Sequence, residues 1–301
     1  MAGIKIGLID VDSHNFPNLP LMKISAWHKM QGDQVEWCNL FEHYDRVYLS
    51  RVFDDTYTED FNTVINADEI IKGGTGYGLE NKLPDEIEHI YPDYSLYPEL
   101  TKDTAFGFLT RGCPNNCPFC IVTTKEGRVS KKVADLNEFW RGQRNIELLD
   151  PNILACKDHK ELLQQLIDTK AKVNFNQGLD ARFVNEKNIE LLSKVNTKMV
   201  HFAFDLMKNE EKIVKGLKLY KEATNINRRE TVVYILTNYN TTHEEDMYRI
   251  NKCIELDYNP YVMIYNKPAA PKITKDLQRW CNNRFIFESS KRNFEAYKKG
   301  R

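Results

Sequence analysis

Residues 106–120 read FGFLTRGCPNNCPFC, and this stretch carries more chemical information than any other part of the chain. Its apolar start is typical of a strand that runs into Gly112. Three cysteines follow in C-x3-C-x2-C spacing, on a segment whose Pro and Asn content favours a loop, namely Cys113, Cys117 and Cys120. This spacing places three thiolates around one centre and supplies no fourth ligand nearby.

Several kinds of site could use three clustered thiols. A structural zinc site needs four ligands, usually from two pairs, so His159, His201 or a remote cysteine would have to join. A ferredoxin-type electron carrier uses four cysteines with a different spacing. A cluster held by only three thiolates keeps one coordination position open, and an open position distinguishes a catalytic metal site from a structural one. Chance clustering is the plain alternative.

The run from Arg111 to Cys120 resembles the motif of the radical SAM superfamily. The resemblance implies that Cys113, Cys117 and Cys120 hold a [4Fe-4S] cluster and that S-adenosylmethionine chelates its open iron. It further implies reductive cleavage of S-adenosylmethionine to methionine and a 5′-deoxyadenosyl radical, which abstracts hydrogen from an unidentified substrate. In that superfamily the aromatic residue before the last cysteine, here Phe119, lies near the adenine.

Outward from this motif, the chain alternates between strand and helix patterns. The predicted strands cover residues 105–109, 146–149, 172–176, 200–204, 231–236 and 261–265. The predicted helices cover residues 136–140, 159–168, 186–194, 209–220 and 244–256. Six such units fit a partial (β/α)6 barrel over residues 104–270 better than a doubly wound sheet. Residues 271–301 then form a C-terminal extension that contains the segment from Trp280 to Tyr297.

Polar residues at the ends of these strands are candidates for contacts with S-adenosylmethionine. Asp150 ends the second strand, where a carboxylate can accept hydrogen bonds from an ammonium group. Its alternative role is that of a turn or helix-capping residue, and the usual Gly-Gly-Glu of the superfamily is missing. Asp205 ends the fourth strand, where superfamily members often place a polar residue against the ribose or carboxylate; a helix cap is its alternative.

The third strand offers two amides on one face, because alternate residues of a strand point the same way. Asn174 and Asn176 would point into the barrel, where a ribose, a carboxylate or a substrate could supply their partners. Arg182 could meet a carboxylate, or it could pair with Asp180 on the surface. His201 reads as a packed core histidine.

The first 83 residues predict a small parallel α/β domain of flavodoxin-like type, covered on both faces of its sheet. The helix patterns lie at Leu19–Met30 and Thr58–Ile65. Residues 84–103 contain several prolines and read as an extended linker. The order of small α/β domain, linker and barrel resembles the cobalamin-binding radical SAM subgroup.

Cobalamin-binding domains carry Asp-x-His-x-x-Gly after the first strand, and Asp12 and His14 match that pattern while Pro17 departs from it. Gly73-Gly74 matches a later glycine pair. Cobalamin is therefore a candidate cofactor, and a cobalamin-dependent methyltransferase is the alternative reaction. A methylthiotransferase would need a second three-cysteine cluster in this domain, where only Cys38 is present.

Overall composition limits the remaining function classes. The 301 residues contain 42 Lys+Arg and 43 Asp+Glu, so a generally basic nucleic-acid-binding surface is not indicated. Seven cysteines, an odd number, argue against a disulfide framework. No apolar run approaches a membrane span and no signal peptide is evident, so a cytoplasmic enzyme is expected. The implied partners are a one-electron donor such as flavodoxin or ferredoxin and a substrate; a non-catalytic protein with a structural Fe–S or zinc site is the rival class.

Overall fold

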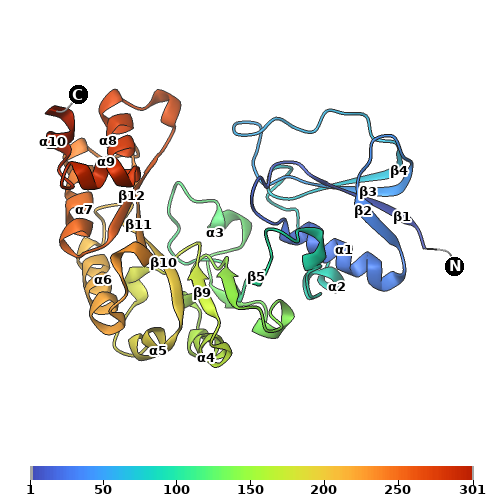
Figure 1. Ribbon diagram of the computed structural model, residues 1–301, viewed down its shortest axis with the longest axis horizontal. Helices are drawn as coiled ribbons and strands as arrows, with labels where there is room; N and C mark the ends of the chain where they lie inside the picture. The colour runs from blue at the N-terminus through green and yellow to red at the C-terminus, as the bar shows by residue number, and fades with distance from the viewer. Residues whose placement is uncertain (1–2, 300–301) are drawn as a thin grey trace.

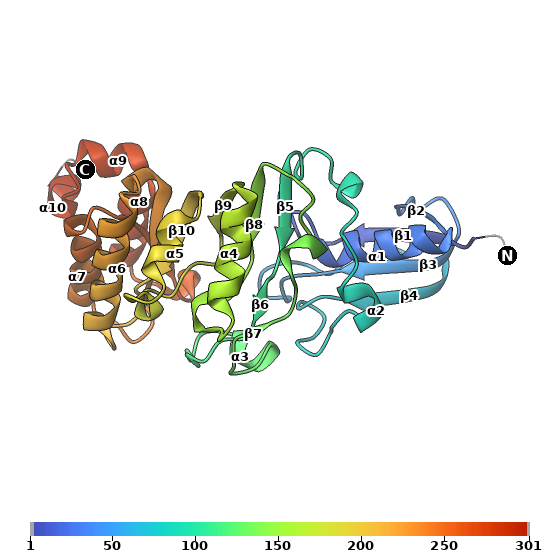
Figure 2. The same cartoon turned by 90° about the horizontal axis from the view of Figure 1, so that it is seen from below.

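The computed structural model describes residues 3–299 and shows an α/β chain with two parallel sheets. The four-stranded sheet of the N-terminal lobe and the six-stranded sheet of the C-terminal lobe lie end to end, with α3 (Val122–Lys125) between them (Figures 1 and 2). Within residues 3–299, no helix has both the length and the apolar character that crossing a bilayer requires.

The N-terminal sheet has the strand order β2-β1-β3-β4, with all neighbours parallel. Its strands are β1 (Lys5–Asp10), β2 (Gln34–Trp37), β3 (Tyr44–Ser50) and β4 (Ala67–Gly73). Helix α1 (Leu19–Gln31) covers one face. It begins at Asn18, whose side chain accepts a hydrogen bond from the Leu21 N–H, and it ends at Gly32, whose φ of 87° is left-handed.

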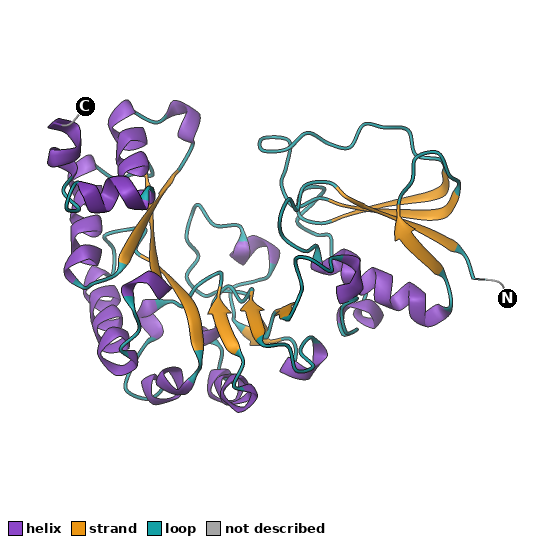
Figure 3. Cartoon of the chain, in the orientation of Figure 1, coloured by secondary structure: helices purple, strands orange, loops and turns teal. Residues whose placement is uncertain are grey.

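The predicted helix over residues 58–65 is wrong, because this segment is a loop between β3 and β4 (Figure 3). Phe61 and Ile65 still pack against the second face of the sheet, beside Tyr44 and Val47. Thr, Asn and Val are poor helix formers. Just before this segment the Asp54 carboxylate accepts a hydrogen bond from the Thr56 N–H at 3.0 Å, which stabilises a local turn. That face is therefore covered by coil and not by a helix.

The proline-rich segment is not simply extended. It contains the one-turn helix α2 (Asp85–Glu88) and a 3-10 turn over Tyr94–Leu96. The Tyr94 hydroxyl donates to the Phe139 carbonyl at 2.7 Å and accepts from the Phe106 N–H at 3.1 Å. These contacts fix the segment to the C-terminal lobe, so the two lobes are joined by packed structure.

The large sheet has the order β5-β8-β9-β10-β11-β12, so neighbouring strands follow one another along the chain and run parallel. Its strands are β5 (Thr104–Gly107), β8 (Asn145–Leu148), β9 (Lys172–Phe175), β10 (Thr197–Ala203), β11 (Thr231–Thr237) and β12 (Asn259–Ile264). All six predicted strands are confirmed within a few residues at their ends.

Helices pack against one face of this sheet (Figure 1). They are α4 (His159–Thr169), α5 (Ile189–Lys194), α6 (Glu210–Thr224) and α7 (His243–Glu255). The predicted helix over residues 136–140 is only a 3-10 turn, Leu136–Glu138. Phe202 illustrates the packing, since its ring lies 5.1 Å from the ring of Tyr220 on α6. The side chains of the adjacent positions, among them His201, point to the opposite, inner face.

The C-terminal helices continue the large lobe instead of extending away from it. They are α8 (Lys272–Asn282), α9 (Arg284–Ser289) and α10 (Phe294–Lys299). Trp280 is fully buried, and its ring lies 4.9 Å from Phe287 and 5.3 Å from Phe294. Gln278 on α8 donates to the Val262 carbonyl on β12 at 3.1 Å, which fixes the helix to the edge of the sheet.

Candidate functional site

The three clustered cysteines lie on a loop with a closed neck. After β5 the chain forms β6 (Thr110–Arg111), which pairs antiparallel with β7 (Lys131–Lys132). Gly112 follows with a φ of 89°, and a Cβ there would lie 2.2 Å from the Val129 carbonyl oxygen. Only glycine allows the two sides of the neck to approach this closely. The Cys113 N–H donates to the Gly127 carbonyl at 3.1 Å and closes the loop further.

Asp150, which directly follows β8, holds the base of this neck by hydrogen bonds. Its carboxylate accepts hydrogen bonds from the Leu109 N–H at 3.1 Å, the Thr110 N–H at 2.5 Å and the Thr110 hydroxyl at 2.6 Å. The side chain is buried, and that burial raises its pKa to about 6 against the opposing effect of these hydrogen bonds. The structure thus gives Asp150 a positioning role under the loop, while its predicted contact with a ligand stays a prediction.

The three thiols are free and half-buried. Burial raises the pKa of Cys117 and of Cys120, and the neighbouring thiols act in the same direction. Within residues 3–299 no three His, Cys, Asp or Glu side chains, the three cysteines included, are gathered tightly enough to hold a metal ion. The three cysteines of this loop nevertheless provide thiolate sulfur, which is the type of ligand that holds iron–sulfur clusters.

Asp180 is the centre of a polar network beside the thiols. Its carboxylate pairs with the Arg182 guanidinium through Nε at 2.7 Å and Nη2 at 2.8 Å. It also accepts from the Asn115 amide on the cysteine loop at 2.5 Å and from the Asn152 amide at 3.1 Å. Next to burial, the Arg182 charge has the largest influence on the Cys117 thiol, whose pKa it lowers. The pair therefore lies against the cysteine loop and not on the open surface.

Asn152 was not predicted as a site residue. Its side chain is buried, and its amide nitrogen lies 3.5 Å from the Cys113 sulfur while also donating to Asp180. Its amide oxygen is buried and makes no hydrogen bond with the part of the chain that the structure describes. The available signal was its position two residues after Asp150 at the same strand end. An unpartnered buried acceptor beside a cluster cysteine is unusual and indicates a place for a donor group.

The two amides of the third predicted strand have different surroundings. Asn174 on β9 is the register partner of Glu147 on β8, and its amide donates to the Glu147 carboxylate at 2.5 Å. The Asn174 amide oxygen is buried and has no hydrogen-bond partner. Burial raises the pKa of Glu147. Asn176 is half-buried at the end of the same strand, and its side chain makes no hydrogen bond within residues 3–299.

Asp205 lies at the end of β10, and a buried arginine supports it. The Asp205 carboxylate accepts from the Leu236 N–H at 3.0 Å, and burial raises its pKa to about 6. Arg249 on α7 is fully buried and donates to the carbonyls of Phe204 at 2.8 Å and Asp205 at 2.5 Å. Its ion-pair partner is Asp246. Sequence reasoning missed Arg249, although an Asp and an Arg three residues apart among the apolar positions of a helix were a usable signal.

Phe119 connects the cysteine loop to the far strands of the sheet. Its ring lies 5.2 Å from the ring of Tyr239, which lies 4.8 Å from the ring of Tyr265, each pair edge to face. Tyr239 and Tyr265 follow the ends of β11 and β12. His201 packs parallel to Tyr234 at 5.3 Å, which agrees with its prediction as a packed histidine. Aromatic side chains thus line the region between the loop and the end of the sheet.

The N-terminal lobe contacts the cysteine loop directly. Lys125, on the helix after Cys120, donates to the Thr75 hydroxyl in the glycine-rich turn of that lobe. Arg111 pairs with Glu126 on the loop at 2.9 Å and with Glu88 on α2 at 3.5 Å. Side chains from both lobes therefore hold the loop in place.

The residues of the N-terminal lobe do not fit a bound cobalamin. The Asp12 carboxylate is occupied by the backbone N–H groups of Val52 at 2.7 Å and Phe53 at 2.8 Å. Gly74 lies so close to the Arg51 carbonyl that a Cβ would come within 2.3 Å of the oxygen. The glycine-rich turn is therefore packed against the neighbouring loop on the side where a Cβ of Gly74 would lie.

Comparisons with known proteins give partial likenesses. No family model matches the chain. A "CDK5RAP1-like protein" of Oryza sativa subsp. japonica is 35% identical in an 85-residue alignment that covers 25% of this chain and 14% of that protein. Streptococcus suis SuiB bound to S-adenosylmethionine is similar over 63% of this chain and 48% of SuiB, with 14% identity and a TM-score of 0.46. SuiB bound to its precursor peptide SuiA is similar over 78% of this chain and 55% of SuiB, with 11% identity and a TM-score of 0.43. The matches therefore span about half the length of SuiB and less than a sixth of the length of the rice protein.

Proposed function

We propose that this chain is a radical SAM enzyme in which Cys113, Cys117 and Cys120 hold a [4Fe-4S] cluster. Such a cluster, when bound, supplies the open iron and the electron for reductive cleavage of S-adenosylmethionine, with hydrogen abstraction from a substrate as the outcome. The observation that carries the proposal is the closed-neck loop with three thiols directly after the first strand of the large sheet. Cluster assembly would draw the three thiols together around one centre.

The order of the six parallel strands supports a partial (β/α)6 barrel over residues 104–270. In barrels of this kind the chemistry lies at the carboxyl ends of the strands. Asp150, Asn176, Asp205 and the cysteine loop all follow such ends. We assign residues 1–83 to a small flavodoxin-like domain, residues 84–103 to the connection and residues 271–301 to the extension. The N-terminal domain then supports the cysteine loop through Thr75, and the connection supports it through Glu88.

Individual residues have distinct tasks in this proposal. Asn176 has a free amide at the strand end and would hydrogen-bond S-adenosylmethionine, and Asp205 keeps one carboxylate oxygen for the same ligand. Phe119 would pack against the adenine, within the aromatic group that includes Tyr239. Asn174 turns its amide nitrogen toward Glu147 and would offer the ligand only its unpartnered oxygen.

Two further elements belong to the proposal. A one-electron donor such as flavodoxin or ferredoxin would reduce the cluster. The reaction would take place in the cytoplasm on an unidentified substrate. Asp150 would act through the loop, because it fixes Leu109 and Thr110 and so sets where the first cysteine emerges.

Cluster assembly tests the ligand assignment directly. Protein reconstituted with iron and sulfide in the absence of oxygen should contain iron and sulfide matching one [4Fe-4S] cluster per chain. Cys113→Ala, Cys117→Ala and Cys120→Ala should each lose most of that iron. Cys38→Ala, which removes a half-buried thiol of the N-terminal lobe, should retain it. Equal iron content in all four variants would show that these cysteines are not the ligands.

A further inference from the structure

A cavity lies at the end of the large sheet that is opposite to the cysteine loop. It has a volume of about 200 Å³ and is bordered by Arg228 and Arg229, which precede β11, by Asn259, which begins β12, and by residues of α9. Because all strands of this sheet are parallel, the amino ends of β11 and β12 are remote from the carboxyl ends that bear the cysteine loop. The proposed cluster chemistry does not use this cavity.

The cavity is positively charged. Arg228, Arg229 and Arg284 line it, and Glu288 is the only carboxylate among the described residues that do so. Arg229 and Arg284 are exposed, and within residues 3–299 neither guanidinium has an ion-pair partner. In a chain whose net charge is −1, three arginines around one small cavity are a marked local excess of positive charge.

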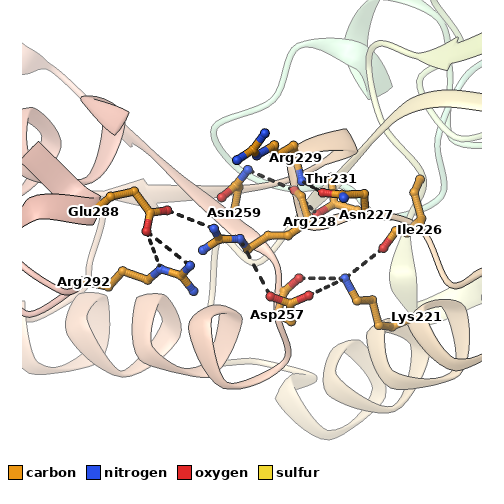
Figure 4. A network of polar contacts seen from close by, with 10 residues as sticks. All are labelled: Lys221, Ile226, Asn227, Arg228, Arg229, Thr231, Asp257, Asn259, Glu288 and Arg292. Carbon is orange, nitrogen blue, oxygen red and sulfur yellow. Dashed lines mark hydrogen bonds and ion pairs between the residues drawn. The ribbon is translucent and has the colours of Figure 1, made fainter. Parts of the chain in front are cut away.

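Arg228 is held in place by its neighbours (Figure 4). Its carbonyl accepts hydrogen bonds from the Thr231 hydroxyl at 2.8 Å and the Asn259 amide at 3.0 Å. Its guanidinium lies between Glu288, at 3.0 Å from Nη2, and Asp257, at 3.8 Å from Nε. Hydrogen bonds from the first residues of β11 and β12 therefore fix the position of Arg228.

The carboxylates beside Arg228 are shared with other cations. Asp257 also pairs with Lys221 at 2.9 Å, and Glu288 also pairs with Arg292 at 3.3 Å (Figure 4). The Nη1 atom of Arg228 is buried and makes no hydrogen bond to any residue of the described range 3–299. A buried guanidinium N–H without an acceptor is costly, and an anion in the cavity would satisfy it after a small shift of the side chain.

We propose that this cavity binds a phosphate group, held by Arg228, Arg284 and Arg229. Planar guanidinium groups match tetrahedral oxyanions by paired, charge-assisted hydrogen bonds. Pockets for drug-sized ligands usually measure about 300–1,000 Å³, so a cavity of about 200 Å³ suits a phosphate or the phosphate end of a monoester and excludes a larger buried ligand. The inference is independent of the cluster, because none of these residues lies on the cysteine loop.

Calorimetric titration of the full chain with inorganic phosphate, against potassium chloride at equal ionic strength, tests the proposal. Saturable binding of one phosphate per chain is expected, with a Kd of about 1 mM or lower. Arg284→Gln and Arg228→Gln should each weaken it by about tenfold. Arg144→Gln is the matched control, because it removes the same charge from an exposed arginine that pairs with Asp103.

Phenyl phosphate in the same titration distinguishes the two sources of the group. Equal affinity for both compounds indicates recognition of free phosphate, whereas tighter binding of phenyl phosphate indicates a monoester; each supports the site. If Arg228→Gln lowers the melting temperature, the exposed Arg284 still provides the test. No saturable binding by the wild type, or unchanged affinity in Arg284→Gln, would overturn the proposal.

Discussion

Asp150 and Thr110 are joined by two hydrogen bonds, from the Thr110 N–H at 2.5 Å and from its hydroxyl at 2.6 Å. This contact connects the end of β8 to the base of the cysteine loop, which begins three residues later. The carboxylate is buried, and no cation among residues 3–299 lies within hydrogen-bond distance of it, so the loop depends on a group whose charge is costly to bury.

The charge of Asp150 predicts a pH dependence of stability. Burial raises its pKa in the folded chain to about 6, above the ordinary value of 3.8. The folded state then binds the proton more tightly than the unfolded state, so stability falls as pH rises from about 4 to about 6. Relative to Asp150→Asn, the wild type should lose up to about 3 kcal/mol of unfolding free energy across this window. Urea unfolding at several pH values gives the unfolding free energy of the wild type minus that of Asp150→Asn. A value that stays constant or rises with pH contradicts the prediction.

Gly112 and Gly127 offer a matched pair of substitutions in the cysteine loop. Both have a left-handed φ, but a Cβ at Gly112 meets the Val129 carbonyl oxygen at 2.2 Å, whereas nothing lies within 4 Å of one at Gly127. Gly127→Ala should cost about 1 kcal/mol from backbone strain alone. Gly112→Ala should cost clearly more and should also lower the iron content after reconstitution. Equal losses of stability and iron would mean that the neck is not closed as described.

Asn152→Asp should disturb the network at the cysteine loop. It would place a second carboxylate about where the amide nitrogen now lies, 3.1 Å from the Asp180 carboxylate, and like charges at that distance repel. We expect a loss of about 1–3 kcal/mol in unfolding free energy together with reduced iron binding. Asn116→Asp, an exposed change on the same loop, is the control and should have little effect on either quantity. Iron binding that is equal in the two variants would remove Asn152 from the site.

Arg249→Met should be one of the most destabilising single changes in the chain. It removes a fully buried guanidinium from the carbonyls of Phe204 and Asp205 and leaves Asp246 without its partner. Breaking a buried ion pair in this way costs about 3–5 kcal/mol, and the double change Arg249→Met/Asp246→Leu should recover part of it. Chemical denaturation measures both values. Lys252→Met on the same helix should cost less than about 1 kcal/mol, and a similar cost for Arg249→Met would contradict the structural role assigned to it.

The alternation of strands and helices in the large lobe was predictable from the sequence, because each strand is buried on the helix side and reads as an apolar run. The first lobe was less predictable. Residues 58–65 have apolar side chains at helical spacing, yet Phe61 and Ile65 reach the sheet from a loop that begins with a turn stabilised by Asp54. Local hydrogen bonding thus outweighed the periodicity.

The cysteine motif could be found by its spacing, and the positions of Asp150, Asn176 and Asp205 followed from strand ends. What surrounds them could not be predicted, since Asp180, Asn152 and Asn115 come from three separate segments that only the tertiary fold brings together. The same holds for Arg249, which donates to carbonyls that directly follow β10 and to the Leu236 carbonyl on β11. Sequence patterns identify the strand ends, but they do not show which side chains already satisfy one another.

Cleavage of S-adenosylmethionine tests the central claim most directly. Wild type and Cys38→Ala, reconstituted without oxygen and reduced with dithionite, should convert S-adenosylmethionine to 5′-deoxyadenosine and methionine, and the two proteins should form equal amounts of each product. Cys117→Ala should form neither product. Chromatographic analysis of the products measures this. A wild-type chain that carries an intact cluster yet forms no 5′-deoxyadenosine, or a Cys117→Ala variant that cleaves as fast as the wild type, would contradict the account.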